Sequence, residues 1–212
     1  SSNGCSGSTA IDSVTVNPIP TLIVTPLKQE ICSGAQTNIA LVSNLPGAVF
    51  SWTITPRSIT GGSNGSTAVG NIIQTLTNPG LTQDSVTYHI VATVDGCSSN
   101  MAPLVDSVEA TILVNPKPVA SAVSPVTICS GDTTNIVITG SVTGSSFSYK
   151  ATTATVLGAG DGAGDVIKQG LSVITALDSV IYMITPTSTQ GCIGNQTKVK
   201  VLVNPRPTIT FL

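Results

Sequence analysis

The 212-residue sequence is poor in charge and in aromatic side chains. Charged residues make up 8% and aromatic residues 3%, whereas about one quarter of a typical soluble domain is charged. Eight Lys and Arg residues, spread thinly from Lys28 to Arg206, cannot form the basic patch that nucleic acid or an anionic membrane surface requires. We therefore expect no nucleic-acid partner.

Long apolar runs and helical periodicity are also missing. The mean hydropathy of +0.38 is high, but Ser, Thr, Asn or Gly interrupts every Val/Ile run. No run reaches the roughly 18 residues that a membrane-spanning helix needs, so membrane insertion is not expected. With 41% hydrophobic residues and a net charge of −2, the composition also argues against disorder, and the chain is expected to fold as a soluble protein.

The sequence does contain an internal repeat. Val-Asn-Pro-x-Pro occurs at residues 16–20, 114–118 and 203–207, and the segment 84–90 returns as 178–184 with the same Asp-Ser-Val start. A fixed period of this kind indicates repeated structural modules. We expect whole modules at residues 19–116 and 117–205, the last strand of a preceding truncated module at residues 1–18, and the start of a following module at residues 206–212.

Each module is dominated by short β-branched runs separated by Gly, Pro, Asn and Ser, such as residues 21–25, 86–94 and 110–114. Roughly six to eight such runs per module predict an all-β chain of tandem immunoglobulin-like antiparallel β-sandwiches. The Asn-Pro-x-Pro joints fix φ twice and remove two backbone donors, so they are short and stiff. Consecutive sandwiches are therefore expected to stack end to end.

Five cysteines are present, two in each whole module and Cys5 left over. The favoured interpretation is one bridge per module, Cys32 with Cys97 and Cys129 with Cys192, in an oxidising, extracytoplasmic setting. In a plain immunoglobulin strand order, however, these positions lie at opposite ends of the sandwich, and a disulfide needs Cα atoms within about 7 Å. Bridges between neighbouring modules and free buried thiols therefore remain alternatives. A zinc site is not expected, because there is no C-x-x-C motif and a single His.

Two Gly-rich loops have compositions that could carry chemistry. Residues 61–65 fit Gly-x-Ser-x-Gly, and Asp84 and His89 follow Ser63 in hydrolase order, but residues 66–70 are a poor helix start. No catalytic residue is therefore nominated. Residues 158–165 are similar to calcium loops, but they contain two acids and the equivalent loop of the first module contains none. A flexible turn is favoured, and no cofactor or metal is expected.

Four landmarks occur twice in the same order: Ile-Cys-Ser-Gly, Phe-Ser-Trp or Phe-Ser-Tyr, Gly-Cys, and Val-Asn-Pro-x-Pro. Together they resemble the PKD-like, immunoglobulin-like repeats of very long surface proteins of gliding bacteria, including gliding-motility adhesins exported by type IX secretion. The resemblance implies a non-enzymatic, stiff spacer in an extracellular adhesin or filament at the cell surface, with activity elsewhere on the polypeptide. Tyr149 in place of Trp52 departs from the pattern but keeps a large aromatic side chain.

Asp-Ser-Val occurs four times, and Asp132-Thr133-Thr134 is close to it. The ordinary interpretation is a turn that ends at Asp, followed by an outward Ser and an inward Val. The bacteria whose surface proteins this sequence resembles O-glycosylate proteins at such triplets. The resemblance therefore implies the hypothesis that sugars are attached to this chain. The implied positions are Ser13, Ser85, Ser107, Ser179 and Thr133.

The expected partners are the neighbouring repeat modules of the same chain. Low charge and Thr-rich strand edges also favour lateral or end-to-end self-association into filaments. An alternative function is a carbohydrate-binding or accessory module of a secreted hydrolase, with surface glycans as ligands. With seven aromatic residues, most of them at repeated core positions, few are left to form an exposed sugar platform.

Overall fold

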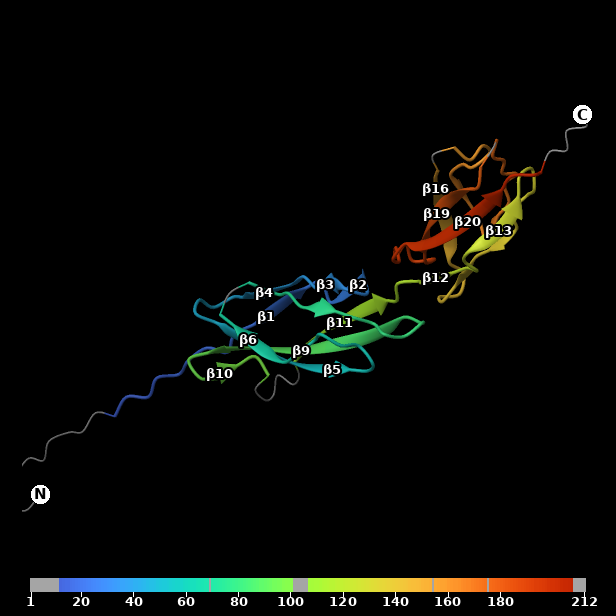
Figure 1. Cartoon of the computed structure of the whole chain (residues 1–212). Coiled ribbons are helices and arrows are strands. Elements are labelled where there is room, and N and C mark those ends of the chain that lie inside the picture. Colours follow the sequence, from blue (N-terminus) through green and yellow to red (C-terminus); the bar gives the residue numbers. More distant parts are fainter. Residues whose placement is uncertain (1–11, 69, 101–106, 154, 175, 208–212) are drawn as a thin grey trace, which may run out of the picture.

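The computed structural model describes residues 12–68, 70–100, 107–153, 155–174 and 176–207. Within these ranges the chain contains strands and no helix, which confirms the all-β, immunoglobulin-like prediction. Two modules lie end to end (Figure 1). The chain enters the first module at the end far from the second, and it leaves the second module at the end far from the first.

The first module is a sandwich of two main sheets. One sheet has the order β2-β11-β9-β5-β6, with β10 paired to β9, and the other has the order β1-β4-β7. A short β3–β8 pair completes the module. The strands are β1 Leu22–Thr25, β2 Lys28–Cys32, β3 Ala35–Gln36, β4 Ile39–Ser43, β5 Val49–Pro56, β6 Gly65–Thr67, β7 Asn71–Ile72, β8 Thr75–Leu76, β9 Asp84–Val94, β10 Cys97–Ser98 and β11 Val108–Asn115.

The second module repeats this plan with shorter strands. Its larger sheet has the order β13-β20-β19-β16-β17, and the pairs β12–β15 and β14–β18 lie in place of the second sheet. The strands are β12 Ala120–Ser121, β13 Val126–Cys129, β14 Ile136–Val137, β15 Thr139–Gly140, β16 Ser146–Thr152, β17 Gly162–Ala163, β18 Val166–Ile167, β19 Asp178–Thr187 and β20 Thr197–Asn204.

The strand that opens each module changes sheets part of the way along. In the first module β1 pairs with β4, and β2 then pairs in parallel with the last strand, β11. The register sets Cys32 opposite Asn115, and in the second module it sets Cys129 opposite Asn204. The early cysteine of each module therefore lies at the end where the chain leaves that module.

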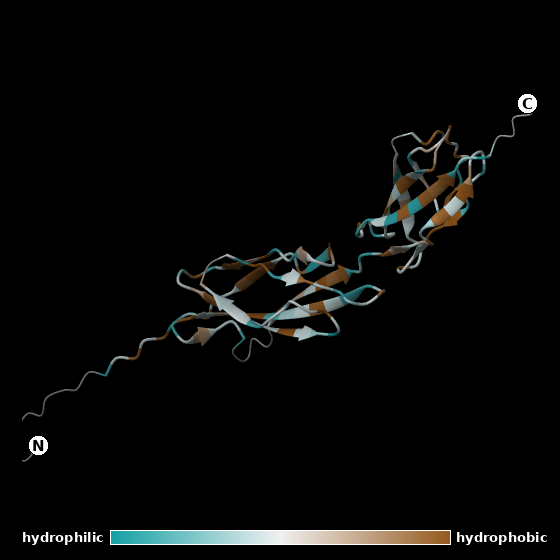
Figure 2. Cartoon of the chain, viewed as in Figure 1, coloured by the Kyte–Doolittle hydropathy of each residue, from teal (hydrophilic) through white to brown (hydrophobic). Residues whose placement is uncertain are grey.

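Each module has its own apolar core. Along β20 apolar and polar residues alternate, as Figure 2 shows, and Val199, Val201 and Val203 are buried. The same two-residue alternation buries Phe50 and Tyr88 of the first module, as the sequence pattern predicts. Because the two core clusters contain residues of one module each, neither module depends on the other for its interior.

A tyrosine at the same position of each core has its hydroxyl hydrogen-bonded. The Tyr88 hydroxyl donates to Gln74 Oε1 at 2.8 Å, and the Gln74 backbone N–H donates to Thr37 Oγ1 at 2.9 Å. Tyr182 and Gln169 form the equivalent bond at 2.6 Å in the second module. The buried polar groups are thus satisfied, and burial raises the pKa of both Tyr88 and Tyr182 to about 12.

We predict that the free energy of unfolding falls as the pH rises from about 10 to about 12. A folded-state pKa above the ordinary value of about 10 means that folding favours the neutral phenol. The stabilisation from the neutral phenol is therefore complete below about pH 10 and is lost progressively as the pH rises to about 12. Urea titrations across this range measure the effect. The double variant Tyr88→Phe/Tyr182→Phe should lose about 1 kcal/mol per hydrogen bond at neutral pH and show a flatter alkaline profile. An unchanged alkaline slope in that variant would contradict the assignment.

Candidate functional site at the junction between the modules

The linker between the modules is held by side chains of the first module. Asn115 is 2% exposed, and its Nδ2 donates to Glu30 Oε1 at 2.8 Å. Its Oδ1 accepts from Gln83 Nε2 at 2.8 Å, and its backbone carbonyl accepts from the Ser33 N–H at 2.8 Å. The start of the linker is therefore fixed in direction by three hydrogen bonds before the prolines begin.

The two linker prolines lie between the modules. Pro116 and Pro118 are both buried, and Gly194 of the second module packs directly on the Pro118 carbonyl. A Cβ at position 194 would lie 1.8 Å from that oxygen, so the close approach requires glycine. A cavity of about 230 Å³ beside the linker is lined from both modules by Leu81, Thr82, Gln83, Pro116, Val142, Thr143, Thr189 and Gln190.

A disulfide joins the modules across this junction. Cys32 at the end of β2 is bonded to Cys192 of the second module, with the Cα atoms 5.6 Å apart and a sequence separation of 160. Cys192 is fully buried, and its backbone N–H donates to Ser188 Oγ at 3.1 Å. The modules are thus linked twice, through the backbone and through the sulfur bridge.

The predicted pairing of Cys32 with Cys97 and of Cys129 with Cys192 is therefore wrong. Cys32 lies near the Asp84 end of β9, whereas Cys97 pairs opposite Val94 at the other end of that strand. The 11-residue strand separates the two levels by about 33 Å at its usual rise per residue, far beyond disulfide reach. The alternative of a bridge between neighbouring modules is the one that the structure forms.

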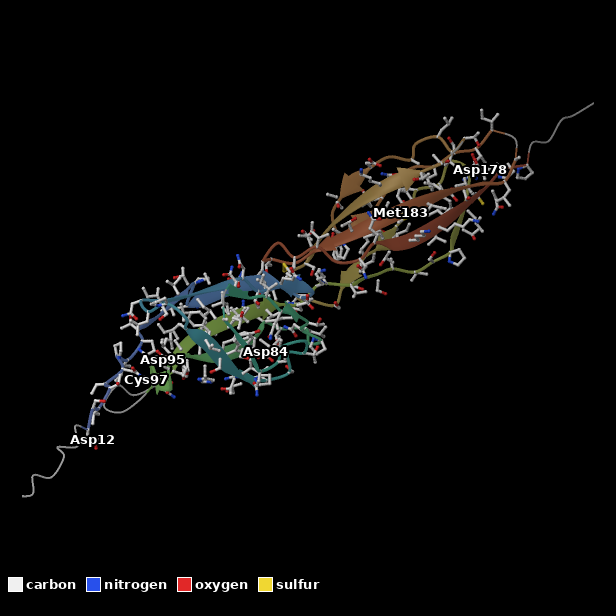
Figure 3. All side chains as sticks on the ribbon, turned by 90° about the vertical axis from the view of Figure 1, so that its left-hand side faces the viewer. Asp12, Asp84, Asp95, Cys97, Asp178 and Met183 are labelled. Atoms are coloured by element: carbon white, nitrogen blue, oxygen red, sulfur yellow. A yellow bond between two sulfur atoms is a disulfide. The ribbon has the colours of Figure 1, made fainter. Side chains whose placement is uncertain are left out.

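Two further cysteines are free thiols. Cys97 lies at the end of the first module far from the second (Figure 3), with its Sγ 3.7 Å from the Asn17 carbonyl oxygen. Cys129 is exposed at the exit end of the second module, opposite Asn204. Cys5 lies outside the described residues. The two free thiols thus mark the outer ends of the two-module unit.

The Ser63, Asp84 and His89 motif does not assemble as a triad. The backbone of Ser63 is bound by the Gln74 side chain, which also contacts its hydroxyl at 3.2 Å. Asp84 instead accepts from Ser58, while His89 contacts Thr55 at 3.0 Å and Glu109 at 3.2 Å. Each of the three side chains therefore has another structural partner.

The Gly158–Asp165 loop is a structural turn. Asp161 Oδ1 accepts from the Ala151 N–H at 2.8 Å, as Asn64 Oδ1 accepts from the Ile54 N–H at 2.9 Å in the first module. Asp161 thus accepts the same backbone hydrogen bond as the uncharged Asn64 at the equivalent position. Among the described residues there is no group of three or more His, Cys, Asp or Glu side chains that could hold a metal ion.

Two of the four Asp-Ser-Val triplets, those at residues 84–86 and 178–180, begin long strands, as the ordinary interpretation predicts, while residues 12–14 lie in no strand and Asp106 lies outside the described residues. Asp84 and Asp178 close their turns through Ser58 and Thr155 respectively, and these hydrogen bonds hold the pKa of both carboxyls below the ordinary value. Of the five implied sugar-attachment positions, Ser13 and Thr133 are exposed, and three are half-buried, namely Ser85, Ser107 and Ser179.

The aromatic residue that could have formed a sugar platform is partly covered. Trp52 is half-buried, its indole N–H donates to the Ser63 carbonyl at 3.0 Å, and its ring packs on Gly65. A cavity of about 510 Å³ on the β5–β9 sheet is lined in part by Trp52, Thr53 and His89. The second module has Tyr149, buried, and Met183 at the corresponding positions, so this surface is not repeated.

Sequence reasoning missed the residues that fix the junction. Glu30 and Gln83 hold Asn115, but the second module has Thr127 and Leu177 at the equivalent positions, so comparison of the repeats gives no signal for them. The intermodule bridge did leave a signal. The two cysteines of a module are expected at opposite ends of an immunoglobulin sandwich, and that geometry excludes a bond between them.

The model of the PKD-like domain family matches residues 29–118 and 126–207. Together these ranges cover most of the chain, and each covers most of one of the two sandwiches. This chain therefore belongs to the PKD-like domain family and carries two copies of the domain. A search of curated proteins found no match.

Solved structures that the search matched to this chain include fibronectin(III)-like modules of Clostridium thermocellum CbhA, Drosophila N-cadherin EC1-3 and the D00-D0 domain of intimin. Their sequence identities to this chain are 12%, 13% and 15%, and their TM-scores are 0.33, 0.32 and 0.38. The alignments cover 91%, 90% and 85% of this chain and 100%, 68% and 99% of the respective structures. In the described part of the chain, no helix is long and apolar enough to cross a membrane.

We predict that the double variant Cys32→Ser/Cys192→Ser keeps both modules folded but loosens the junction. The two cores are separate, so neither should collapse, while loss of a 160-residue closed loop should lower the free energy of unfolding by about 2–5 kcal/mol. Small-angle scattering should show a broader distribution of intramolecular distances, and denaturant titration gives the stability. The matched control, Cys97→Ser/Cys129→Ser, should change neither quantity. An equally narrow distance distribution in the first variant would show that the bridge does not set the geometry.

Proposed function

We propose that this chain is a stiff, non-enzymatic spacer in an extracellular bacterial surface adhesin or filament. The observation that carries the proposal is the doubly linked junction, in which Cys32–Cys192 and a clamped, proline-containing linker connect consecutive modules. Such a junction restricts bending between modules, which a flexible tether does not require. A rod that holds a distal part of the protein at a set distance does require it.

The bridge also limits how far the chain can be stretched. Because Cys32 and Cys192 are 160 residues apart in a chain of 212, a force on the two termini bypasses everything between them. Even with both modules unfolded, the remaining 52 or so residues reach only about 180 Å. The reduced chain would reach about 720 Å at the same length per residue. Low extensibility suits a spacer under tension.

Residues 12–16 support the view that further modules precede the first. By the repeat, Val14 and Val16 correspond to Ile112 and Val114, which are fully buried in the last strand of the first module. In this chain Val14 and Val16 are 85% and 87% exposed. Two apolar side chains in the alternation of a last strand, without a sheet to cover them, fit the last strand of a preceding module.

The sulfur chemistry supports an extracellular location. A disulfide that joins two modules persists in an oxidising environment, such as that outside the cytoplasm. The finer assignment, to a gliding-motility adhesin exported by type IX secretion, rests on the four landmarks that this chain shares with such repeats. The membership of the PKD-like domain family agrees with that assignment.

Removal of residues 21–207 from the full-length surface protein tests the spacer role. Pro20 then joins Thr208 in register with the repeat. We expect the activity of the distal part to persist and the projections seen by electron microscopy to shorten by two modules. Two PKD-like modules with unrelated surface residues should restore the length. A loss of attachment that these replacement modules do not restore would instead favour the alternative, a binding module for surface glycans.

We also propose that sugars are attached at the Asp-Ser-Val and Asp-Thr-Thr triplets. Ser13 and Thr133 are exposed, and a glycan coat would add solubility to a surface that carries little charge. Intact mass spectrometry of protein from its native host should give a mass above that of the polypeptide. Replacement of Thr133 by Val should remove one glycan increment. A native mass equal to that of the bare polypeptide would rule out this modification.

A further inference from the structure

The two free thiols occupy the same repeat positions as the two bonded ones. Cys129 follows Ile128 at the end of β13, as Cys32 follows Ile31 at the end of β2. Cys97 follows Gly96, as Cys192 follows Gly191. Each module thus has an early cysteine at its exit end and a late cysteine at its entry end. Cys32–Cys192 joins an early cysteine to the late cysteine of the next module.

The linker prolines and the cysteines at the outer ends are equivalent to those of the junction, whereas the contacts of Glu30, Gln83 and Gly194 are not repeated there. Pro116 and Pro118 are buried between the modules, whereas their equivalents at the exit end, Pro205 and Pro207, are half-buried and exposed. The cysteines show the same difference, which indicates that each outer end is one half of a junction. Cys192 is fully buried and Cys97 half-buried, while Cys32 is half-buried and Cys129 exposed.

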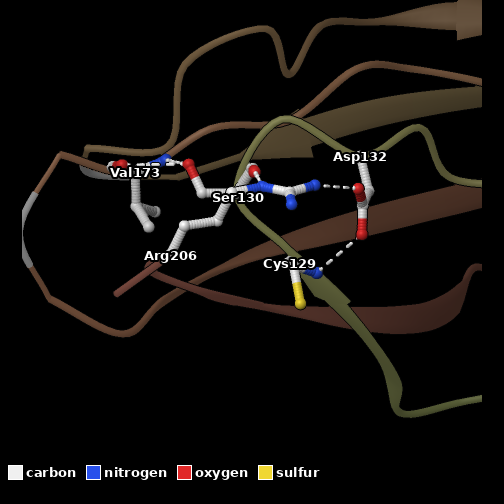
Figure 4. Close-up of polar contacts among 5 residues, drawn as sticks. All are labelled: Cys129, Ser130, Asp132, Val173 and Arg206. Carbon is white, nitrogen blue, oxygen red and sulfur yellow. Dashed lines mark hydrogen bonds and ion pairs between the residues drawn. The ribbon is translucent and has the colours of Figure 1, made fainter. Parts of the chain in front are cut away.

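The turn that carries Cys129 is already fixed without a partner (Figure 4). Arg206, from the repeated Asn-Pro-x-Pro segment, donates to the Ser130 carbonyl and to Asp132 Oδ1, both at 2.6 Å. Asp132 Oδ2 in turn accepts from the Cys129 N–H at 3.2 Å. Arg206 thus donates to two residues of the turn, and Asp132 links the arginine to the Cys129 backbone. The thiol is therefore presented in a defined position at the exit end of the rod.

We propose that Cys97 and Cys129 form the same bridge to adjoining modules, so that every junction of the array carries one disulfide. Cys129 bonds the late cysteine of the following PKD-like module, and Cys97 bonds the early cysteine of the preceding one. The partner is thus another module of the same type, with its thiol at the Cys192 or Cys32 position. The proposal stands on the repeat geometry and does not require the spacer role.

The bond forms by thiol–disulfide exchange with an oxidant of the disulfide class, such as glutathione disulfide. One thiol loses its proton, and the thiolate attacks a glutathione sulfur, which gives a mixed disulfide and releases one glutathione. The second protein thiolate then attacks the protein sulfur of that mixed disulfide and releases the second glutathione. Two protein thiols are oxidised, and one glutathione disulfide is reduced to two thiols.

Such bridges would give the rod a continuous path of limited extension. Cys97 and Cys129 are 32 residues apart, and this segment runs from the entry end of one module to the exit end of the next. Fully stretched, it reaches about 110 Å. Force along the array would pass through these short segments and the bridges, and the longer segment from Cys32 to Cys97 would lie outside the path.

A chain extended by one module tests the proposal. Residues 21–118 are appended after Pro207, where they continue the repeat in register. Ser99 of the added copy is replaced by Gly, the residue at the equivalent position 194, so that the added Cys97 can meet Cys129. The extended chain is folded, oxidised in a glutathione redox buffer and mapped by mass spectrometry of its proteolytic peptides. We expect two bridges, Cys32–Cys192 and Cys129 with the added Cys97. Of the seven cysteines, Cys5, the first Cys97 and the added Cys32 remain as thiols.

The internal bridge controls for folding and oxidation in the same sample. A sample with Cys32–Cys192 formed and Cys129 still alkylated would overturn the proposal, because the second junction had the same opportunity to form. Compared with the extended chain, its Cys129→Ser variant should differ in two ways only. The bridge to the added Cys97 is lost, and the added Cys97 is found as a thiol. Random pairing in that variant, including bonds to Cys5, would also count against the proposal. Neither result bears on the spacer role, which the excision experiment tests separately.

Discussion

The parallel pairing of the opening strand with the last strand is the constraint on which the rest of this molecule depends. Because β2 runs beside β11 in the same direction, Cys32 ends at the exit of its module, next to Asn115. An antiparallel partner there would have placed the cysteine at the entry end. The same pairing of β13 with β20 places Cys129 at the exit of the second module. Sheet topology thus decides which cysteines can meet.

The stiff linker brings Cys192 of the second module within bonding distance of Cys32. Cys192 has to arrive within about 7 Å of Cys32, and a long flexible linker would let it sample many other positions. The Asn-Pro-x-Pro segment prevents this, because its prolines have fixed φ and Asn115 is bound to Glu30 and Gln83. Stiff linker and disulfide therefore support one another. The linker brings the thiols together, and the bridge keeps the linker from bending.

The sequence predicts the β-sandwiches well and the bridge poorly, for a physical reason. Strands, turns and the buried Tyr88 and Tyr182 follow from local alternation that occurs twice, so each module supports the interpretation of the other. Cysteine pairing depends on the end of the sandwich at which each thiol lies, and equal numbers per module suggest the wrong partners. The polar contacts of Asn115 involve Glu30 and Gln83, which the second module does not repeat, so no pattern in the sequence indicates them.

A second link changes what a junction can do. One covalent connection between two rigid bodies leaves rotation about its bonds, whereas two connections at separate points remove most of that freedom. The modules have few charges for surface ion pairs, and exposed pairs contribute little in any case. Covalent bridging is thus a means of stiffening that does not depend on salt or on surface charge. It suits modules whose cores are rich in Val and Ile and whose outer faces carry few charged residues.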